Sequence, residues 1–518
     1  MDGDGIGRLG SNNQTKAMNR LGNFGGGSWL FAGICCLFVA LSWVWPALFG
    51  PKNDMLPSLV AWASAAVLFV LLPLSRERAE LAIASGWLLA AMISSVIGLL
   101  QFFDLENGLA PWVVVTRPGH VLANVHQVNL LATLLGVGLL SLWWMTLNRH
   151  IKPIPAGSIA CLLIVGLAAT ASRTGLIHAI LVSGLLLFWG RFSRLSWTVV
   201  ALGLATYVIA ALSLPWFQES MGIATGRDLV SRFGESSACS SRFLIWTNVL
   251  QLISLKPFTG WGWDGLAYAH YITPIDAPRF CEKLSNAHNF PLQLAVGLGL
   301  PVAVVVVSGI FFTVWKVKPW LARNSSEQLA WGALLLLGAH SLLEYPLWFG
   351  VPQVMAALAI WVVWRGRQLQ PTQAVASPAA GTTFAIRSAG AALMLSALAY
   401  VAWDYFRITQ LFTPIVERHP DYRTDTLIKV KGSWLFQHYV LYAVVNTTTA
   451  DKNNAGLVLE VALEVLKDFP DPEIIAKVIE AAKFTGDSAL VALHVERFKS
   501  AWPKDFAAWE LEHSKVGK

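Results

Sequence analysis

The chain has 518 residues, of which 55% are hydrophobic, only 13% are charged and 24 are tryptophan. Charged residues make up about a quarter of an ordinary globular domain, so a soluble fold could not cover this much apolar surface with so few charges. The formal net charge is +7, and the basic excess lies entirely in the first 404 residues, as expected of loops beside membrane helices rather than of a nucleic-acid surface. The composition therefore indicates an all-α polytopic membrane protein and excludes a purely soluble enzyme.

Apolar stretches long enough to cross a bilayer recur along most of the chain. We expect eleven transmembrane helices, at residues 28–48, 57–74, 80–102, 126–147, 156–171, 175–190, 196–215, 289–316, 327–345, 348–364 and 386–405. The first stretch is long and lacks a small-residue cleavage site, so it does not read as a cleaved signal peptide. Residues 1–27 are expected to form a cytoplasmic N-terminal tail.

Basic residues in the short loops predict the orientation of these helices. The loops on one side carry Arg76, Arg78, Arg149, Lys152, Arg191, Arg194, Lys316, Lys318, Arg323, Arg365, Arg367 and Arg387. The short loops on the other side carry only Lys52, Arg117 and Arg173. Because positive charge is enriched in cytoplasmic loops, we expect the first set to be cytoplasmic and the C-terminus to be periplasmic.

Three further segments are not expected to cross the membrane. Residues 216–288 form a long periplasmic loop, in which an amphipathic helix begins near Ser240 and runs to about Leu255. Residues 366–386 are rich in Gly, Pro, Ala, Thr and Gln and are expected to form a flexible cytoplasmic linker. Residues 406–518 show apolar stripes at helical spacing, with breaks at Phe469-Pro470 and Thr485-Gly486. They predict a periplasmic array of helical hairpins that resembles tetratricopeptide units, although no 34-residue repeat stands out.

Two of the five cysteines, Cys239 and Cys281, share the long loop. An oxidising periplasm would allow them to form a disulfide, and two free thiols are the alternative. No spacing of cysteines and histidines is typical of a zinc site. We expect neither a metal nor a cofactor.

Polar side chains collect at the ends of the expected helices, all on the outer side. They are His126, Gln127 and Asn129 at the fourth helix, Arg173 between the fifth and sixth, His288, Asn289 and Gln293 at the eighth, and His340 and Glu344 at the ninth. Ionisable groups at membrane depth are costly without a role or a partner. This one-sided arrangement predicts a site that opens to the periplasm.

His340 lies six residues before Pro346, about 9 Å along a helix at 1.5 Å per residue. Glu344 follows one turn later on the same face, where it can orient the imidazole. An imidazole titrates in the range that suits a general base. Arg242, on the amphipathic helix of the long loop, and Arg173 are cations suited to an anionic headgroup, above all a diphosphate.

Each of these residues also has a structural explanation. Arg173 could extend its side chain to lipid headgroups, and His288 could cap a helix at the interface. Gln127 and Asn129, like Asn289 and Gln293, could serve as hydrogen bonds between helices. His340 and Glu344 could be a buried structural pair.

Five segments in chain order resemble one family. They are His126-Gln127-Val128-Asn129-Leu130-Leu131-Ala132-Thr133, Ala171-Ser172-Arg173-Thr174-Gly175, Ser241-Arg242-Phe243-Leu244-Ile245-Trp246 through Gly260-Trp261-Gly262, His288-Asn289, and His340-Ser341-Leu342-Leu343-Glu344-Tyr345-Pro346-Leu347-Trp348. Together they resemble the bacterial O-antigen ligase and polymerase superfamily, and the first and last resemble its protein O-oligosaccharyltransferase (pilin glycosylation ligase) branch. Val128 departs from this pattern, because the branch usually has proline there.

The resemblance implies a GT-C-like membrane fold in the bacterial inner membrane and an inverting, metal-independent glycosyl transfer on the periplasmic side. The donor would be a glycan on undecaprenyl pyrophosphate, and the acceptor a Ser or Thr hydroxyl of an exported protein such as pilin. His340 and Glu344 would be catalytic, and Arg173 and Arg242 would bind the pyrophosphate. Gln127, Asn129, His288, Asn289 and Tyr345 would support the site.

Other functions remain open. An O-antigen ligase would use the same donor but a lipid A–core acceptor, and an O-antigen polymerase would join two lipid-linked glycans. A transporter is the alternative of another class. It is disfavoured because no inverted repeat is evident. Apart from the donor and acceptor, the expected partners are membrane lipids and not nucleic acid.

Overall fold

The computed structural model describes residues 26–516, except 47–49, 53, 73–74, 224–240, 277, 323 and 368–379. Every regular element in these residues is a helix, which agrees with the expected all-α class. Most of the predicted N-terminal tail, the middle of the predicted linker, Arg323 and Cys239 lie outside the described residues.

The first seven expected stretches all form helices. These are α2 (Gly26–Val44), α3 (Met55–Leu71), α4 (Arg76–Phe102), α5 (Val128–Leu147), α6 (Pro153–Ala169), α7 (Arg173–Trp189) and α8 (Arg194–Ser220). The remaining four stretches contain α12 (Phe290–Leu298), α13 (Leu300–Val317), α14 (Ser325–Ser341), α15 (Gly350–Arg367) and α16 (Ala380–Thr409). The eighth stretch is thus two helices, because the chain turns at Gly299, whose φ of 86° is readily adopted only by glycine.

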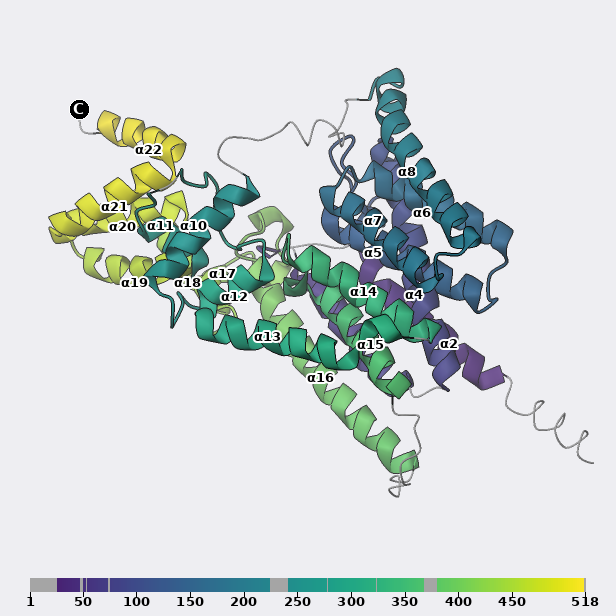
Figure 1. Cartoon of the computed structure of the whole chain (residues 1–518). Coiled ribbons are helices and arrows are strands. Elements are labelled where there is room, and N and C mark those ends of the chain that lie inside the picture. Colours follow the sequence, from purple (N-terminus) through teal and green to yellow (C-terminus); the bar gives the residue numbers. More distant parts are fainter. Residues whose placement is uncertain are drawn as a thin grey trace, which may run out of the picture.

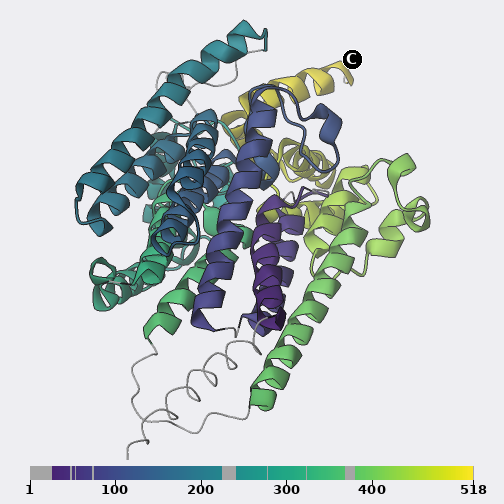
Figure 2. The same ribbon diagram turned by 90° about the vertical axis from the view of Figure 1, so that its right-hand side faces the viewer.

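The bundle is built around α4, which packs against α2, α5 and α6, while α14 packs against α5, α7 and α15. Small residues let these helices approach closely, as is usual between membrane helices. At Gly138 an added Cβ would lie 2.4 Å from the Cβ of Ala91, so no larger residue fits between α5 and α4. Figures 1 and 2 show the earlier helices of this bundle in purple and blue and the later ones, α14 and α15, in green, with α16 running beside them.

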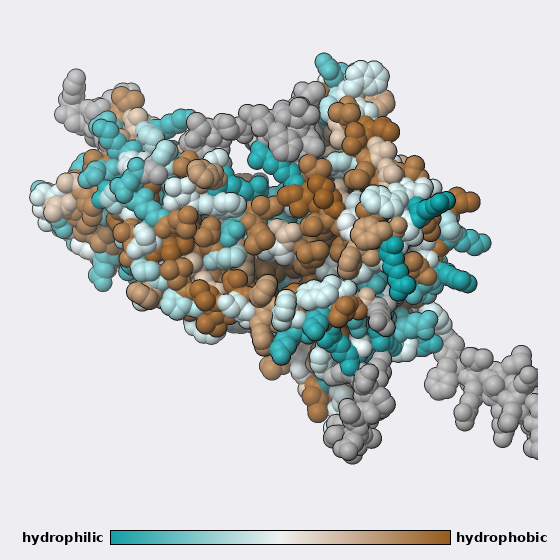
Figure 3. All heavy atoms as spheres, in the orientation of Figure 1, coloured by the Kyte–Doolittle hydropathy of each residue, from teal (hydrophilic) through white to brown (hydrophobic). Residues whose placement is uncertain are grey.

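Five of the described helices are long and apolar enough to cross a membrane. They comprise α4, α5, α8 and the stretches Leu300–Leu321 and Thr382–Thr409, and several shorter helices are also apolar. The chain is therefore a helical membrane protein. Eleven crossings and their sidedness stay predictions. In Figure 3 hydrophobic side chains cover much of the visible face of the bundle.

Two segments differ from the predicted boundaries. The linker is shorter than expected, because α15 continues to Arg367 and α16 already begins at Ala380, in a stretch rich in alanine. Helix α8 continues past Pro215 to Ser220, five residues beyond the predicted end. Pro215 is tolerated inside the helix, and Gln218 anchors this last turn by donating to the Phe102 carbonyl at 2.8 Å.

The long loop and the C-terminal tail form one helical body. The loop contains α10 (Arg242–Leu255) and α11 (Leu266–Ile272), and the tail contains α17 (Thr426–Val430), α18 (Gln437–Thr447), α19 (Ala455–Asp468), α20 (Pro472–Thr485), α21 (Ser488–Ala501) and α22 (Pro503–Val516). Successive helices from α18 to α22 pack on each other, and α11 packs on α19 and α21. In Figure 1 these helices gather at one end of the molecule, the tail in yellow-green and the loop in teal.

Candidate functional site

The carboxylate of Glu344 is the centre of a polar cluster. Its Oε1 accepts hydrogen bonds from a guanidinium nitrogen of Arg242 and from Nδ2 of Asn129, the latter at 3.1 Å. Its Oε2 lies 2.6 Å from Nδ1 of His288. The Glu344 side chain is only 8% exposed. Because a buried carboxylate is costly without partners, these contacts explain why it is tolerated at the end of a membrane helix.

The partners of Glu344 come from the starts of different helices. Arg242 is the first residue of α10, and Ser241 before it caps that helix by accepting from the Leu244 amide at 3.3 Å. His288 stands just before α12, with a left-handed φ of 49°. Asn289 then caps α12 through the Leu292 amide at 3.1 Å.

Two contacts fix this turn against the end of α14. Asn289 donates through Nδ2 to the carbonyl of Leu342 at 3.0 Å. The ring of Tyr345 meets His288 edge to face, with the ring centres 5.0 Å apart. Asn289 and Tyr345 therefore position His288 beside Glu344 and do not touch its carboxylate themselves.

The cluster reaches α7 through Asn129, the second residue of α5. Ser172 donates from its hydroxyl to Oδ1 of Asn129 at 2.6 Å and also caps α7, because the Gly175 amide donates to it at 3.2 Å. Arg173 is the first residue of α7, and its side chain is exposed. The starts of α5, α7, α10 and α12 thus meet around one carboxylate, and helix starts carry positive partial charge.

His340 is held by Thr133 and not by Glu344. The Nδ1 atom of His340 lies 2.9 Å from the Thr133 hydroxyl, which itself donates to the carbonyl of Asn129 at 3.0 Å. A hydroxyl has one proton to donate, so it accepts from Nδ1–H of His340. In its neutral form the imidazole therefore has its lone pair on Nε2. The expectation that Glu344 holds this tautomer is wrong, since its carboxylate turns to Arg242 and His288 instead.

The imidazole of His340 is 0% exposed, and its Nε2 has no hydrogen-bond partner among the described residues. The ring of His178, from α7, lies edge to face with it at 6.2 Å between centres. His178 donates through Nε2 to the Leu336 carbonyl at 3.2 Å. Two buried imidazoles thus lie side by side one helical turn below the Glu344 cluster.

No role was predicted for Thr133, His178 or Ser172. Ser172 precedes a helix and has the side chain of a typical N-cap, so this signal was available. His178 is an ionisable residue inside an apolar stretch, which is also a usable signal. Thr133 follows Asn129 by one helical turn, but its pairing with a residue of another helix is not visible in the sequence.

The remaining expected residues lie apart from these contacts. Gln127 precedes α5, and its buried Oε1 has no hydrogen-bond partner among the described residues. Gln293 accepts from the Ala287 amide at 2.7 Å and so shapes the turn that carries His288.

Cys281 is disulfide-bonded. The predicted partner Cys239 lies outside the described residues, so this pairing stays a prediction. Among the described residues, no three His, Cys, Asp or Glu side chains are grouped as metal ligands.

An aromatic surface lies next to the cluster. Trp263, in the turn after α10, stacks on Trp348 with the ring centres 5.5 Å apart and the planes 10° from parallel. Phe290 meets Trp348 edge to face at 6.3 Å. Trp263 is half exposed, so the cluster is bordered by a flat apolar face that solvent can reach.

Comparison with known proteins links the chain to glycan-transferring membrane proteins. Residues 158–307 match the family model described as O-antigen ligase, and residues 328–516 match the model described as virulence factor membrane-bound polymerase, C-terminal. These two segments contain Arg173, Arg242, His288, His340 and Glu344.

Two curated proteins of Acinetobacter baylyi are similar. The chain is 24% identical over 290 residues to a general O-oligosaccharyltransferase, covering 53% of this chain and 49% of that protein. It is 25% identical over 236 residues to a ComP-specific O-oligosaccharyltransferase, covering 44% and 41%. The aligned part thus spans less than half the length of each relative.

Proposed function

Because the chain belongs to the superfamily of O-antigen ligases and O-oligosaccharyltransferases, we propose that it is a membrane glycosyltransferase. It moves a glycan from undecaprenyl pyrophosphate to a Ser or Thr hydroxyl of an exported protein such as pilin. The observation that carries this proposal is the meeting of four helix starts with Arg242 and His288 around one carboxylate. Such an arrangement suits a polyanionic ligand.

The chemistry requires stabilisation of a diphosphate leaving group. Charge builds up on the diphosphate as the glycosidic bond breaks, and fixed cations lower the energy of that state. Arg242 is held in place by Glu344 and remains 29% exposed. A guanidinium has five N–H donors, so the contact to Glu344 leaves others for phosphate oxygens. The exposed Arg173 supplies a second cation from the start of α7.

The same transfer requires that the acceptor hydroxyl lose its proton. Thr133 accepts from Nδ1 of His340, so Nε2 is the basic nitrogen, and it has no hydrogen-bond partner among the described residues. His340 is therefore the general base, and Thr133 positions it. Since the ring is buried, side chains around it must move before the acceptor hydroxyl reaches Nε2. The hydroxyl attacks opposite the departing diphosphate, so the sugar carbon inverts its configuration.

The glycan needs a surface of its own beside the diphosphate. The faces of sugar rings are apolar enough to pack on aromatic side chains, and the half-exposed Trp263 on Trp348 provides such a surface. We place the first sugars of the donor there. The loop-charge pattern supports a position of this end of the bundle on the periplasmic side of the bacterial inner membrane.

A lipid A–core acceptor is the second candidate, because one matching family model is described as O-antigen ligase. Polymerase activity is the third candidate, because the family model that matches residues 328–516 is described as virulence factor membrane-bound polymerase, C-terminal. Reconstitution of the purified chain with lipid-linked oligosaccharide, offering pilin-like protein and lipid A–core in parallel, separates these acceptors. We expect transfer to protein. Transfer to lipid A–core alone would make the chain an O-antigen ligase, and transfer to neither acceptor would contradict both proposals.

A further inference from the structure

A cleft of about 480 Å³ lies between α3, α15 and α16. Its walls are apolar side chains of α3 and α15, among them Phe69, Leu72, Ala357 and Trp361, together with the stem of Arg387 of α16. A volume in the range of about 300–1,000 Å³ suits a small ligand or a single lipid chain better than a protein segment.

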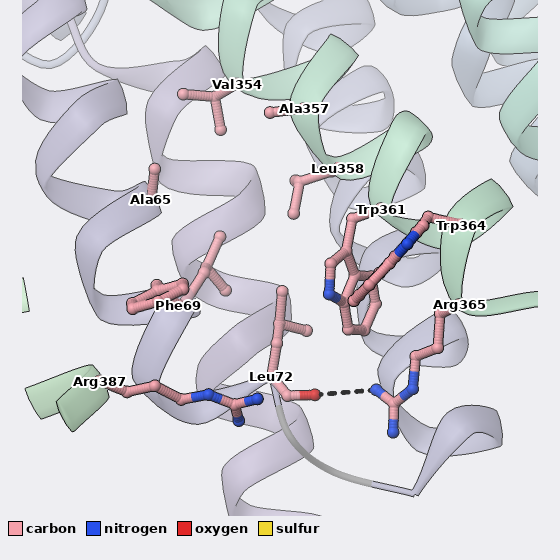
Figure 4. A pocket seen from close by; sticks show the side chains of 11 residues that line it. Ala65, Phe69, Leu72, Val354, Ala357, Leu358, Trp361, Trp364, Arg365 and Arg387 are labelled. Carbon is pink, nitrogen blue, oxygen red and sulfur yellow. Dashed lines mark hydrogen bonds between the residues drawn. The ribbon is translucent and has the colours of Figure 1, made fainter. Parts of the chain in front are cut away.

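One end of the cleft is positively charged. Arg365 donates to the Leu72 carbonyl at 3.2 Å and lies over the Trp361 ring at 4.9 Å. Figure 4 shows Arg365 and Arg387 at this end, turned toward Leu72 from opposite sides. No acidic residue is among the described residues that line the cleft. Glu80, which attracts Arg365, is already ion-paired with Arg76 at 2.6 Å.

The cleft lies at the end of the bundle away from the Glu344 cluster. The starts of α3 and α15 are joined where the Gly350 amide donates to the Ser58 hydroxyl at 3.0 Å. Their ends are joined by the contact between Arg365 and Leu72. Fifteen residues of α15 separate these two levels, which is about 22 Å of helix. Glu344 lies before α15, so the arginines of the cleft are at the opposite, predicted cytoplasmic, membrane surface.

Helix α16 packs on α3 but leaves most of its own surface exposed. Only 6% of its most apolar window is buried in the structure. Phe69 and Arg387 are nevertheless close enough to line one cleft, so the gap between α16 and the bundle is open to a lipid chain. A molecule that fills this gap would bury apolar surface on all three helices at once.

We propose that the cleft binds one anionic phospholipid of the adjacent leaflet. Its acyl chain lies between α3, α15 and α16, and its phosphate lies between Arg365 and Arg387. The lipid thereby adds to the packing of α16 on the bundle. Arginine side chains bind phosphate oxygens in fork geometry, and the net positive charge selects an anionic over a zwitterionic headgroup.

Native mass spectrometry of the full chain tests this proposal with phosphatidylglycerol and phosphatidylcholine. Wild type should retain one phosphatidylglycerol at collision energies that remove phosphatidylcholine, and phosphatidylglycerol should raise its thermal midpoint. Arg387→Gln should lose this retained lipid, and Arg365→Gln/Arg387→Gln should also lose the thermal shift. Ala357→Trp should exclude the acyl chain while leaving both arginines in place.

Two matched variants act as controls. Arg191→Gln/Arg194→Gln removes the same charge from exposed positions just before and at the start of α8, and Ile360→Trp places the same side chain on the exposed face of α15. Both should bind lipid as wild type does. Equal retention by wild type and the cleft variants would overturn the proposal, as would equal retention of the two lipids. A full thermal shift with inorganic phosphate alone would show that the arginines take a free anion and not a lipid.

Discussion

At the scale of single residues, the contact between Thr133 and His340 decides which imidazole nitrogen is basic. Thr133→Val removes the hydroxyl at nearly constant volume and leaves Nδ1 without its partner. Loss of a group that orients a functional histidine typically costs about 10–100-fold in activity. We therefore expect glycan transfer to fall by about this factor and donor affinity to stay unchanged, measured by single-turnover assays.

Thr133→Ser is the matched control, because it keeps the hydroxyl and should recover most of the rate. The pH dependence of the transfer rate gives a second readout. A base held in the wrong tautomer changes the shape of this dependence and not only the maximum rate. Wild-type rates and an unchanged profile in Thr133→Val would show that Thr133 has no part in positioning His340.

Loss of Arg242 or Arg173 should weaken donor binding, whereas loss of His340 should not. Charge-assisted hydrogen bonds contribute about 1.5–3 kcal/mol, so Arg242→Ala and Arg173→Ala should each weaken donor binding by roughly 10- to 100-fold and slow transfer as well. Lysine at either position should rescue only part of the loss, because a point charge does not reproduce the guanidinium fork. Binding of lipid-linked oligosaccharide to purified variants measures this. Normal donor affinity in both alanine variants would contradict the assignment.

The residues of the site were largely predictable, but most of their contacts were not. Arg242, His288, Asn129 and Glu344 were all expected near one outer surface, and the structure joins them directly. The partner of His340 was assigned wrongly because helical spacing points to Glu344 one turn away. Thr133 lies 207 residues from His340 in sequence, and no local pattern reports such a contact.

At the scale of elements, the C-terminal tail rests on the long loop through a titratable contact. The Tyr271 hydroxyl of α11 lies 2.8 Å from Nδ1 of His494 of α21, and both side chains are buried. Burial lowers the pKa of His494 below its usual value, and the nearby Arg497 lowers it further. Burial and Arg279 likewise lower the pKa of His270, on α11, to about 3.

A histidine with a lowered pKa in the docked state favours undocking when it takes up a proton. The stability it contributes is present above the ordinary value of about 6.5 and is lost as the pH falls below that value. We expect the tail to become more sensitive to limited proteolysis between pH 7.5 and pH 5. His494→Gln should reduce this change, with His270 causing the remainder. An identical pH dependence in both proteins would contradict the role of His494.

Hydrophobicity predicted well which segments form helices. Every expected apolar stretch is helical, and α19 and α20 end at the predicted breaks. Hydrophobicity predicted the boundaries of the helices less well. The turn at Gly299 was hidden inside a continuous apolar run, because apolar length does not report backbone conformation. The shorter linker has a similar cause, since Ala380 and its neighbours are weakly polar yet form a helix.

At the scale of the whole molecule, the two ends of the bundle have different surfaces. One end carries the Glu344 cluster, and the other carries Arg76, Glu80 and Arg365. The charge pattern predicts that the second end is cytoplasmic. Reporter fusions after Ile408 and within residues 366–386 should therefore report opposite sides of the membrane. The same side for both would leave α16 outside the membrane and move the tail away from the proposed site.

The most direct test of the central claim is single-turnover glycan transfer by His340→Ala, measured across pH 5–9 together with donor affinity. The account predicts that donor binding survives while transfer falls by about 10²–10⁴-fold, the usual contribution of a general base. His150→Ala, in an exposed loop at the other end of α5, should behave as wild type. Near wild-type transfer by a folded His340→Ala would contradict the assignment of His340 as the base.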